Sequence, residues 1–145
     1  MPSYVRDVVV KQAPGEVFAF CSDLRNELRW NPDAQSVVLL TGEPIGVGAR
    51  YRARWRGAPE AIVELVAYDP PRSWATRSRT LGMDAITAGL VEPCDAGSRF
   101  KIRVELRPHG LSHLLAPLAL RLMARQEVRN MARIRAALKS EGGIS

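Results

Sequence analysis

Hydrophobic and polar residues alternate along most of the chain, and this alternation predicts a sheet of many strands. In residues 50–56, Tyr51, Ala53 and Trp55 alternate with four arginines. Since successive side chains of a strand point to opposite faces, these three residues share one face and the arginines share the other. Similar patterns, bounded by Gly, Pro, Asn or Asp, predict further strands over residues 4–10, 37–40, 60–68, 73–80, 83–92 and 98–107.

Two short helices are predicted between the first two strands. Pro14 suits the first turn of a helix, and an apolar run through Cys21 follows it. Ser22-Asp23 reads as a cap before a second short helix, which Asn31-Pro32 ends.

Residues 111–139 predict one long C-terminal helix. Ser112 is a plausible N-cap, and Leu120, Met131 and Ile134 recur at helical spacing, so one side can lie against the sheet. Pro117 falls inside the segment, where a proline predicts a kink or a break.

The connection Gly57-Ala58-Pro59 sets the pairing of the two strands that flank it. A three-residue turn places Arg56 opposite Glu60 and Arg52 opposite Glu64, which gives favourable cross-strand charge pairs. A two-residue turn would place the aromatic residues of the first strand opposite those acids, so the longer turn is preferred.

Composition indicates one globular domain over residues 1–145. Hydrophobic residues make up 46% of the chain and charged residues 25%, the proportions of a folded protein rather than a disordered one. No segment approaches the ~18 consecutive apolar residues of a membrane span. The first residues lack the pattern of an export signal, so we expect a cytoplasmic protein.

Few residues carry recognisable chemistry. Cys21 and Cys94 have no metal-site or redox spacing and are expected to be free thiols. His109 and His113 lie four residues apart, but no third ligand is evident, so no metal site is predicted. Phosphate-loop, nucleotide and nucleophile-elbow motifs are missing, and no cofactor is expected.

Positive charge is concentrated in the predicted C-terminal helix. The chain has a net charge of +6, and residues 111–139 hold six basic residues and one acid. Arg121, Arg125, Arg129 and Arg133 repeat every fourth residue, next to a leucine-rich segment. Such a stripe favours contact with an anionic membrane surface, or else is a solvated face that aids solubility. Nucleic-acid binding is not expected, because no aromatic residues are interleaved with the stripe.

The order of elements and five short motifs resemble the START-like superfamily, also called SRPBCC. Its members include polyketide cyclases and dehydrases, the birch-pollen allergen family and coenzyme-Q-binding proteins. The motifs are Pro14-x-x-Val17-Phe18, Trp30-Asn31-Pro32, Gly46-x-Gly48-x-x-Tyr51, Tyr68-Asp69-Pro70-Pro71 and Glu92-Pro93. The resemblance implies an α+β helix-grip fold, in which a curved seven-stranded antiparallel sheet holds a long C-terminal helix.

The same resemblance implies an apolar cavity between the sheet and the long helix. Strand alternation and helix spacing supply the candidate ligand-binding residues: Trp30, Tyr51, Ala53, Trp55, Val63, Leu65, Trp74, Thr76, Ser78, Thr87, Gly89, Phe100, Ile102, Leu120 and Met131. Several of these are small, which favours a hollow. The alternative is that the tryptophans, Leu120 and Met131 fill the space. The opening of the cavity is expected near Trp30.

Three function classes follow from the cavity. The first is a carrier of a lipid, quinone or polyketide-like molecule. The second is a polyketide cyclase or dehydrase, in which, by resemblance, Tyr51 acts as an acid or hydrogen-bond donor. The third is a partner-binding or stress-related protein of the same fold with a filled cavity. The superfamily hosts many functions on one fold, and the carrier is preferred.

Overall fold

The computed structural model describes residues 3–80, 82–110, 114 and 116–142. Its strands are β1 (Ser3–Val10), β2 (Ala34–Leu39), β3 (Arg50–Trp55), β4 (Ala61–Asp69), β5 (Ser73–Thr80), β6 (Met83–Cys94) and β7 (Gly97–Pro108). Its helices are α1 (Pro14–Cys21), the short 3₁₀ turn η1 (Leu24–Asn26), α2 (Glu27–Trp30) and α3 (Ala116–Gly142).

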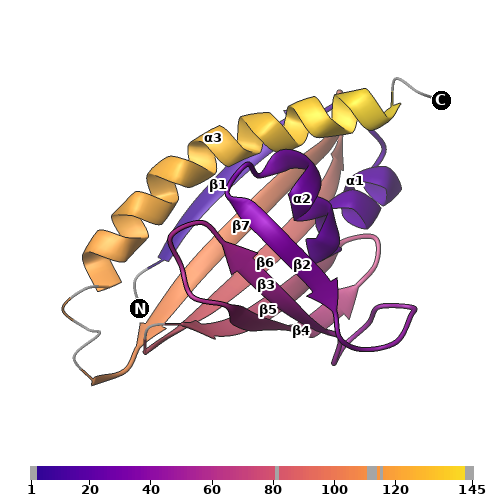
Figure 1. Ribbon diagram of the computed structural model, residues 1–145. Coiled ribbons are helices and arrows are strands. Elements are labelled where there is room, and N and C mark those ends of the chain that lie inside the picture. The colour runs from indigo at the N-terminus through magenta and orange to yellow at the C-terminus, as the bar shows by residue number, and fades with distance from the viewer. Residues whose placement is uncertain (1–2, 81, 111–113, 115, 143–145) are drawn as a thin grey trace.

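All seven strands form one antiparallel sheet in the order β1-β7-β6-β5-β4-β3-β2. The sheet curves, and α3 lies along its concave side over β1 and β7, with α1 and α2 on the same side (Figure 1). This arrangement is the α+β helix-grip fold that the sequence predicts, and its elements occur in the predicted order.

Strand pairing keeps the predicted inner face continuous across the sheet. Leu65 on β4 pairs with Thr76 on β5, Thr76 with Thr87 on β6, and Thr87 with Val104 on β7. A neighbouring row joins Val63, Ser78, Ala85 and Leu106 in the same way. Because paired residues point to the same side of a sheet, the inner-face assignments made from alternation are correct for these strands.

The predicted register of the β3–β4 hairpin is wrong. Arg50 pairs with Glu64, and Arg52 pairs with Ile62, so neither the three-residue nor the two-residue turn is formed. Residues 56–60 form a longer connection, in which the Ala58 N–H donates to the Trp55 carbonyl. The shift is an even number of residues, so each side chain keeps its face, and Arg52 still forms an ion pair with Glu60 at 3.5 Å.

Pro117 does not kink the long helix. The helix begins at Ala116, so Pro117 lies in its first turn. Backbone N–H groups in the first turn have no intrahelical acceptor, so the N–H that proline lacks costs the helix no hydrogen bond. The proposed cap Ser112 lies outside the described residues. Further along, Met131, Ile134 and Leu138 are buried and join the main hydrophobic cluster, which fixes the helix against the sheet.

Trp74 occupies one end of the inner face. Its ring is stacked on Phe100, with centroids 5.6 Å apart and planes 9° apart, and it meets Phe18 of α1 edge-on at 5.6 Å. The ring also covers Gly89 so closely that a Cβ at that position would lie 2.3 Å from it. Gly89 is therefore the residue that lets Trp74 lie flat on the sheet.

Replacing Gly89 with Ala is expected to destabilise the protein. Because the added methyl group would displace the Trp74 ring from a packed cluster, we expect a loss of about 1–3 kcal/mol in the free energy of unfolding. Urea denaturation measures it. Gly46→Ala is the control, since a Cβ there meets nothing within 4 Å, and an equal effect of the two substitutions would contradict this account of Gly89.

Candidate ligand-binding site

Three hydrophobic clusters lie on the inner side of the sheet. The first surrounds Trp74 and Phe100, the second surrounds Tyr51 and Val63, and the third contains Tyr4, Val104 and Leu106. Between them lie Thr76, Ser78 and Thr87, which belong to none of the clusters and are each partly exposed. We call these three residues the hydroxyl band.

The backbone of the long helix α3 lies closest to β1 and also approaches β7 and α2. The band lies on β5 and β6, and side chains of α3 belong to the same clusters as Trp74 of β5 and Ala85 of β6. The middle of the inner face therefore carries small, partly exposed, hydroxyl-bearing side chains with apolar clusters around them. This is the environment of a site for an apolar molecule with a few polar groups.

Several of the predicted ligand-binding residues are core residues in this structure. The buried ones are Tyr51, Ala53, Val63, Leu65, Trp74, Gly89, Phe100 and Met131. They fill the two ends of the inner face, as the filled-core alternative expects of Trp74 and Met131. Direct contact of these residues with a ligand stays a proposal.

The remaining predicted residues border the clusters. Trp30 and Ile102 pack against the first cluster, Trp55 against the second and Leu120 against the third. The Trp55 indole N–H also donates to Glu27 of α2 at 3.1 Å, so this ring holds a short helix against β3. Trp30 is likewise partly buried, on the side of α2 that faces the core.

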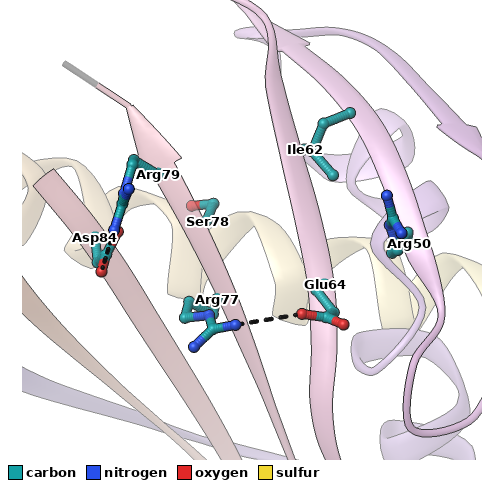
Figure 2. A pocket seen from close by; sticks show the side chains of 7 residues that line it. All are labelled: Arg50, Ile62, Glu64, Arg77, Ser78, Arg79 and Asp84. Atoms are coloured by element: carbon teal, nitrogen blue, oxygen red, sulfur yellow. Dashed lines mark hydrogen bonds and ion pairs between the residues drawn. The ribbon is translucent and has the colours of Figure 1, made fainter. Parts of the chain in front are cut away.

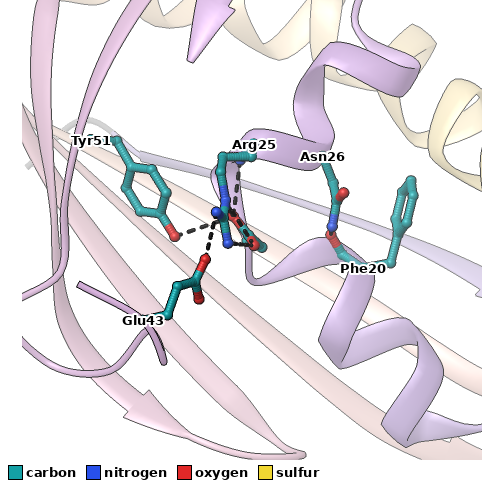
Figure 3. A network of polar contacts seen from close by, with 6 residues as sticks. Phe20, Arg25, Asn26, Glu43 and Tyr51 are labelled. Atoms are coloured by element: carbon teal, nitrogen blue, oxygen red, sulfur yellow. Dashed lines mark hydrogen bonds and ion pairs between the residues drawn. The ribbon is translucent and has the colours of Figure 1, made fainter. Parts of the chain in front are cut away.

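Tyr51 is fully buried and hydrogen bonded. Its hydroxyl donates to Asp23 at 3.3 Å, across 28 residues of chain (Figure 3). Burial, followed by the nearby negative charge of Asp23, raises the pKa of Tyr51 above its usual value. The phenol is therefore neutral at physiological pH and donates a hydrogen bond.

Asp23 joins this phenol to two further charged groups. Its carboxylate accepts from the Arg25 backbone and side chain, with the shortest contact at 2.7 Å, and Arg25 also contacts Glu43 at 2.7 Å. Burial of Asp23 acts to raise its pKa, but the hydrogen bonds and charge of Arg25 outweigh burial, so the pKa is lowered. The sequence correctly indicated a helix cap at Asp23. The alternation of residues along a strand could not predict the hydrogen bond between Asp23 and Tyr51.

Arg6 is an inner-face residue that sequence reasoning missed. It pairs with Ile102 in the β1–β7 ladder and so faces the same side as Tyr4 and Val8. Its guanidinium lies 5.7 Å from the Tyr4 ring centroid and donates to the Val5 carbonyl at 2.9 Å. Its Nε is buried without a hydrogen-bond partner. The alternation Tyr4, Arg6, Val8 is a signal that could have placed it there.

Residues 1–138 match the protein family described as "Polyketide cyclase / dehydrase and lipid transport". The match covers nearly the whole chain. The chain belongs to this family. No curated protein matches the sequence significantly.

Several solved structures are similar in fold to this family member. Ara h 8.0201 is 18% identical with a TM-score of 0.72, over 96% of this chain and 98% of that one. TTHA0849 from Thermus thermophilus is 14% identical with a TM-score of 0.77, over 97% and 99%. DynU16, a protein of the dynemicin biosynthetic locus, is 13% identical with a TM-score of 0.69, over 96% of this chain and 48% of that one. At these identities the likeness shows the fold.

Within residues 3–80, 82–110, 114 and 116–142, no three His, Cys, Asp or Glu side chains are grouped to hold a metal ion. His109 lies 3.2 Å from Asp84, and His113 is outside the described residues. Burial raises the pKa of the Cys21 thiol to about 12, so it is protonated and unreactive.

Arg25→Gln is expected to reduce stability more at pH 7 than at pH 3. Because the folded-state pKa of Asp23 is lowered, its ionised pairing stabilises the fold above the unfolded-state pKa near 4 and is lost as the pH falls through the folded-state value. For this partly exposed pair we expect a cost of about 1 kcal/mol at pH 7.

Urea denaturation at the two pH values measures this difference. Arg56→Gln is the matched control, since Arg56 is exposed and should show little effect at either pH. An Arg25→Gln cost that is the same at pH 7 and pH 3 would show that Asp23 ionisation does not contribute.

Proposed function

We propose that this protein binds a hydrophobic small molecule, such as a lipid, quinone or polyketide-like compound, on the inner face of its sheet and carries it. The observation that carries the proposal is the hydroxyl band, which lies partly exposed between three apolar clusters. Family membership over residues 1–138 supports the same class of ligand.

The middle of the inner face differs from an ordinary protein core. Protein interiors are filled at crystal-like density, usually by large apolar side chains. Thr76, Ser78 and Thr87 are small and polar, and each is partly exposed. An apolar molecule placed there would contact the three hydrophobic clusters. Its polar groups would accept hydrogen bonds from the three hydroxyls or donate hydrogen bonds to them.

Filling the hydroxyl band is expected to abolish binding. Thr87→Phe places a ring in the middle of the band, so we expect at least about a tenfold loss of affinity for an apolar ligand such as decanol, since the ring occupies the volume the ligand needs. Isothermal titration calorimetry measures the affinity, and circular dichroism confirms the fold.

Ile86→Phe is the matched control. Ile86 precedes Thr87 on β6 and points to the opposite face of the sheet. Unchanged decanol affinity in Thr87→Phe, with a folded protein, would rule out the band as the binding site.

A polyketide cyclase or dehydrase is the second candidate function. The family description favours it. The neutral phenol of Tyr51 is a hydrogen-bond donor, but it is fully buried and already donates to Asp23, so it would have to exchange this partner for a substrate. Product formed from a linear poly-β-ketone would favour the enzyme, whereas unchanged substrate recovered with the protein would favour the carrier.

We propose that α3 brings the carrier to an anionic membrane. On its outer side, Leu118, Leu122 and Val128 are more than half exposed, and Arg121, Arg125 and Arg129 are exposed among them. Leu114, just before the helix, is the most exposed of the large apolar residues in the described chain. Apolar and cationic side chains on one helix face suit contact with anionic headgroups.

Arg133 does not share this position. It is partly buried and donates to Asn130 at 3.3 Å, because a four-residue repeat drifts around a helix of 3.6 residues per turn. Among the described residues, no helix is long and apolar enough to cross a bilayer, so the proposal concerns surface contact. A cytoplasmic location is part of the proposal, supported by the free state of Cys21 and Cys94.

Removing two helix charges is expected to weaken vesicle binding. At ~1 kcal/mol per cation near an anionic surface, the double variant Arg121→Gln/Arg125→Gln should bind vesicles of phosphatidylserine and phosphatidylcholine about tenfold or more weakly. Vesicle sedimentation measures the bound fraction. The double variant Arg54→Gln/Arg56→Gln removes equal charge from β3 and the connection after it, and should bind like the wild type. Equal binding of the wild type to pure phosphatidylcholine would contradict the electrostatic contact.

A further inference from the structure

β4 and β5 separate at one end. Their ladder ends at the pair Val63–Ser78, although β4 begins two residues earlier at Ala61 and β5 continues to Thr80. Ile62 and Arg79, the next residues on the two strands, are not paired to each other. The sheet is therefore open between these two strand ends.

A hollow of about 480 Å³ lies at this separation (Figure 2). Its lining residues are Arg50, Ile62, Glu64, Arg77, Ser78, Arg79 and Asp84. Most of these point to the outer face, but Ser78 pairs with the buried Val63 and belongs to the inner face. The hollow therefore borders the strand position of an inner-face residue, and Ser78 is one end of the hydroxyl band.

Two of the three guanidinium groups that line the hollow, those of Arg50 and Arg77, are available to bind an anion. Asp84 is held by Arg79 at 2.7 Å and by His109 at 3.2 Å, so that carboxylate is already satisfied. Glu64 contacts Arg77 at the longer distance of 3.5 Å, with both side chains exposed to solvent. Exposed pairs of this length are weak, so Arg77 can exchange Glu64 for another anion.

Arg50 is the third cation of the hollow. Within the described chain its side chain forms no ion pair or hydrogen bond, and only its backbone N–H donates, to Thr41 at 3.2 Å. Arg50 pairs with Glu64 in the β3–β4 ladder, and Glu64 pairs with Arg77 in the next. The two arginines therefore flank the mouth of the hollow on either side of one exposed carboxylate.

We propose that the opening between β4 and β5 admits an apolar ligand that carries a carboxylate, and that Arg50 and Arg77 bind this carboxylate while the apolar part reaches the hydroxyl band past Ser78. The proposal rests on the proposed function and specifies its ligand class and the side from which the ligand enters. It places the opening away from Trp30, whose ring packs against the core.

Ile62 supports an amphipathic ligand over a small inorganic anion. Its side chain is 43% exposed at the rim of the hollow, next to the guanidinium groups. A ligand with an apolar chain gains contact with Ile62 and the inner face, whereas a small inorganic anion gains only two exposed charge contacts, which salt weakens.

Comparing decanoate with decanol distinguishes the contribution of the carboxylate to the affinity from that of the apolar chain. They share an apolar chain and differ in the carboxylate, so calorimetric titration of both isolates the role of Arg50. In Arg50→Gln we expect decanoate binding about fivefold to tenfold weaker at low salt, from the loss of one exposed charge-assisted contact, with decanol binding unchanged. Glu64→Gln frees Arg77, so decanoate should bind more tightly than to the wild type.

Arg54→Gln is the matched control, because Arg54 lies on the same strand and the same face as Arg50 but does not line the hollow. Its affinities for both ligands should equal those of the wild type. Decanoate binding that is equal in the Arg50 and Arg54 variants, with decanol still bound, would overturn this inference and leave the proposed function standing. Equal weakening of decanoate and decanol by Arg50→Gln would overturn carboxylate recognition, and failure of the wild type to bind either ligand would overturn both.

Discussion

The packing of Trp74 on Gly89 is the contact on which the rest of the inner face depends. By lying flat on β6, the ring reaches Phe100 on β7 and Phe18 on α1 at once. It thereby joins the first helix to the sheet in one cluster with Met131 of α3. Because this cluster fills one end of the concave surface, the ligand that we propose would lie on the part of β5 and β6 beyond it.

The opposite end is closed by hydrogen bonds that fix the short helices. Tyr51 reaches Asp23 and Trp55 reaches Glu27, so two inner-face side chains of β3 hold the segment between α1 and β2. With both ends of the face occupied, Thr76, Ser78 and Thr87 remain between them. The function we propose follows from this division, since a carrier needs walls that stay fixed and a middle that can be filled and emptied.

Alternation predicted the faces of the strands correctly because it is a local property. Each side chain's face follows from its position within one strand, and an even shift of register at residues 56–60 left the faces unchanged even though the predicted charge pairs were wrong. The predicted break at Pro117 marked the start of a helix, because the physical effect of proline depends on where the helix begins.

The parts of the site that the sequence did not predict depend on contacts between distant residues. The Asp23–Tyr51 bond, the role of Gly89 beneath Trp74 and the separation of β4 from β5 each require positions far apart in the chain to be known together. Arg6 is an exception, because its position between Tyr4 and Val8 in an alternating strand is enough to place it on the inner face.

Native mass spectrometry of the freshly purified protein tests the central claim most directly, because it weighs the chain together with whatever it holds. The account predicts a second species heavier than the polypeptide by the mass of one small organic molecule, which is released by organic solvent. A single species at the mass of the bare chain, unchanged after incubation with excess decanol, would contradict it and indicate a filled inner face.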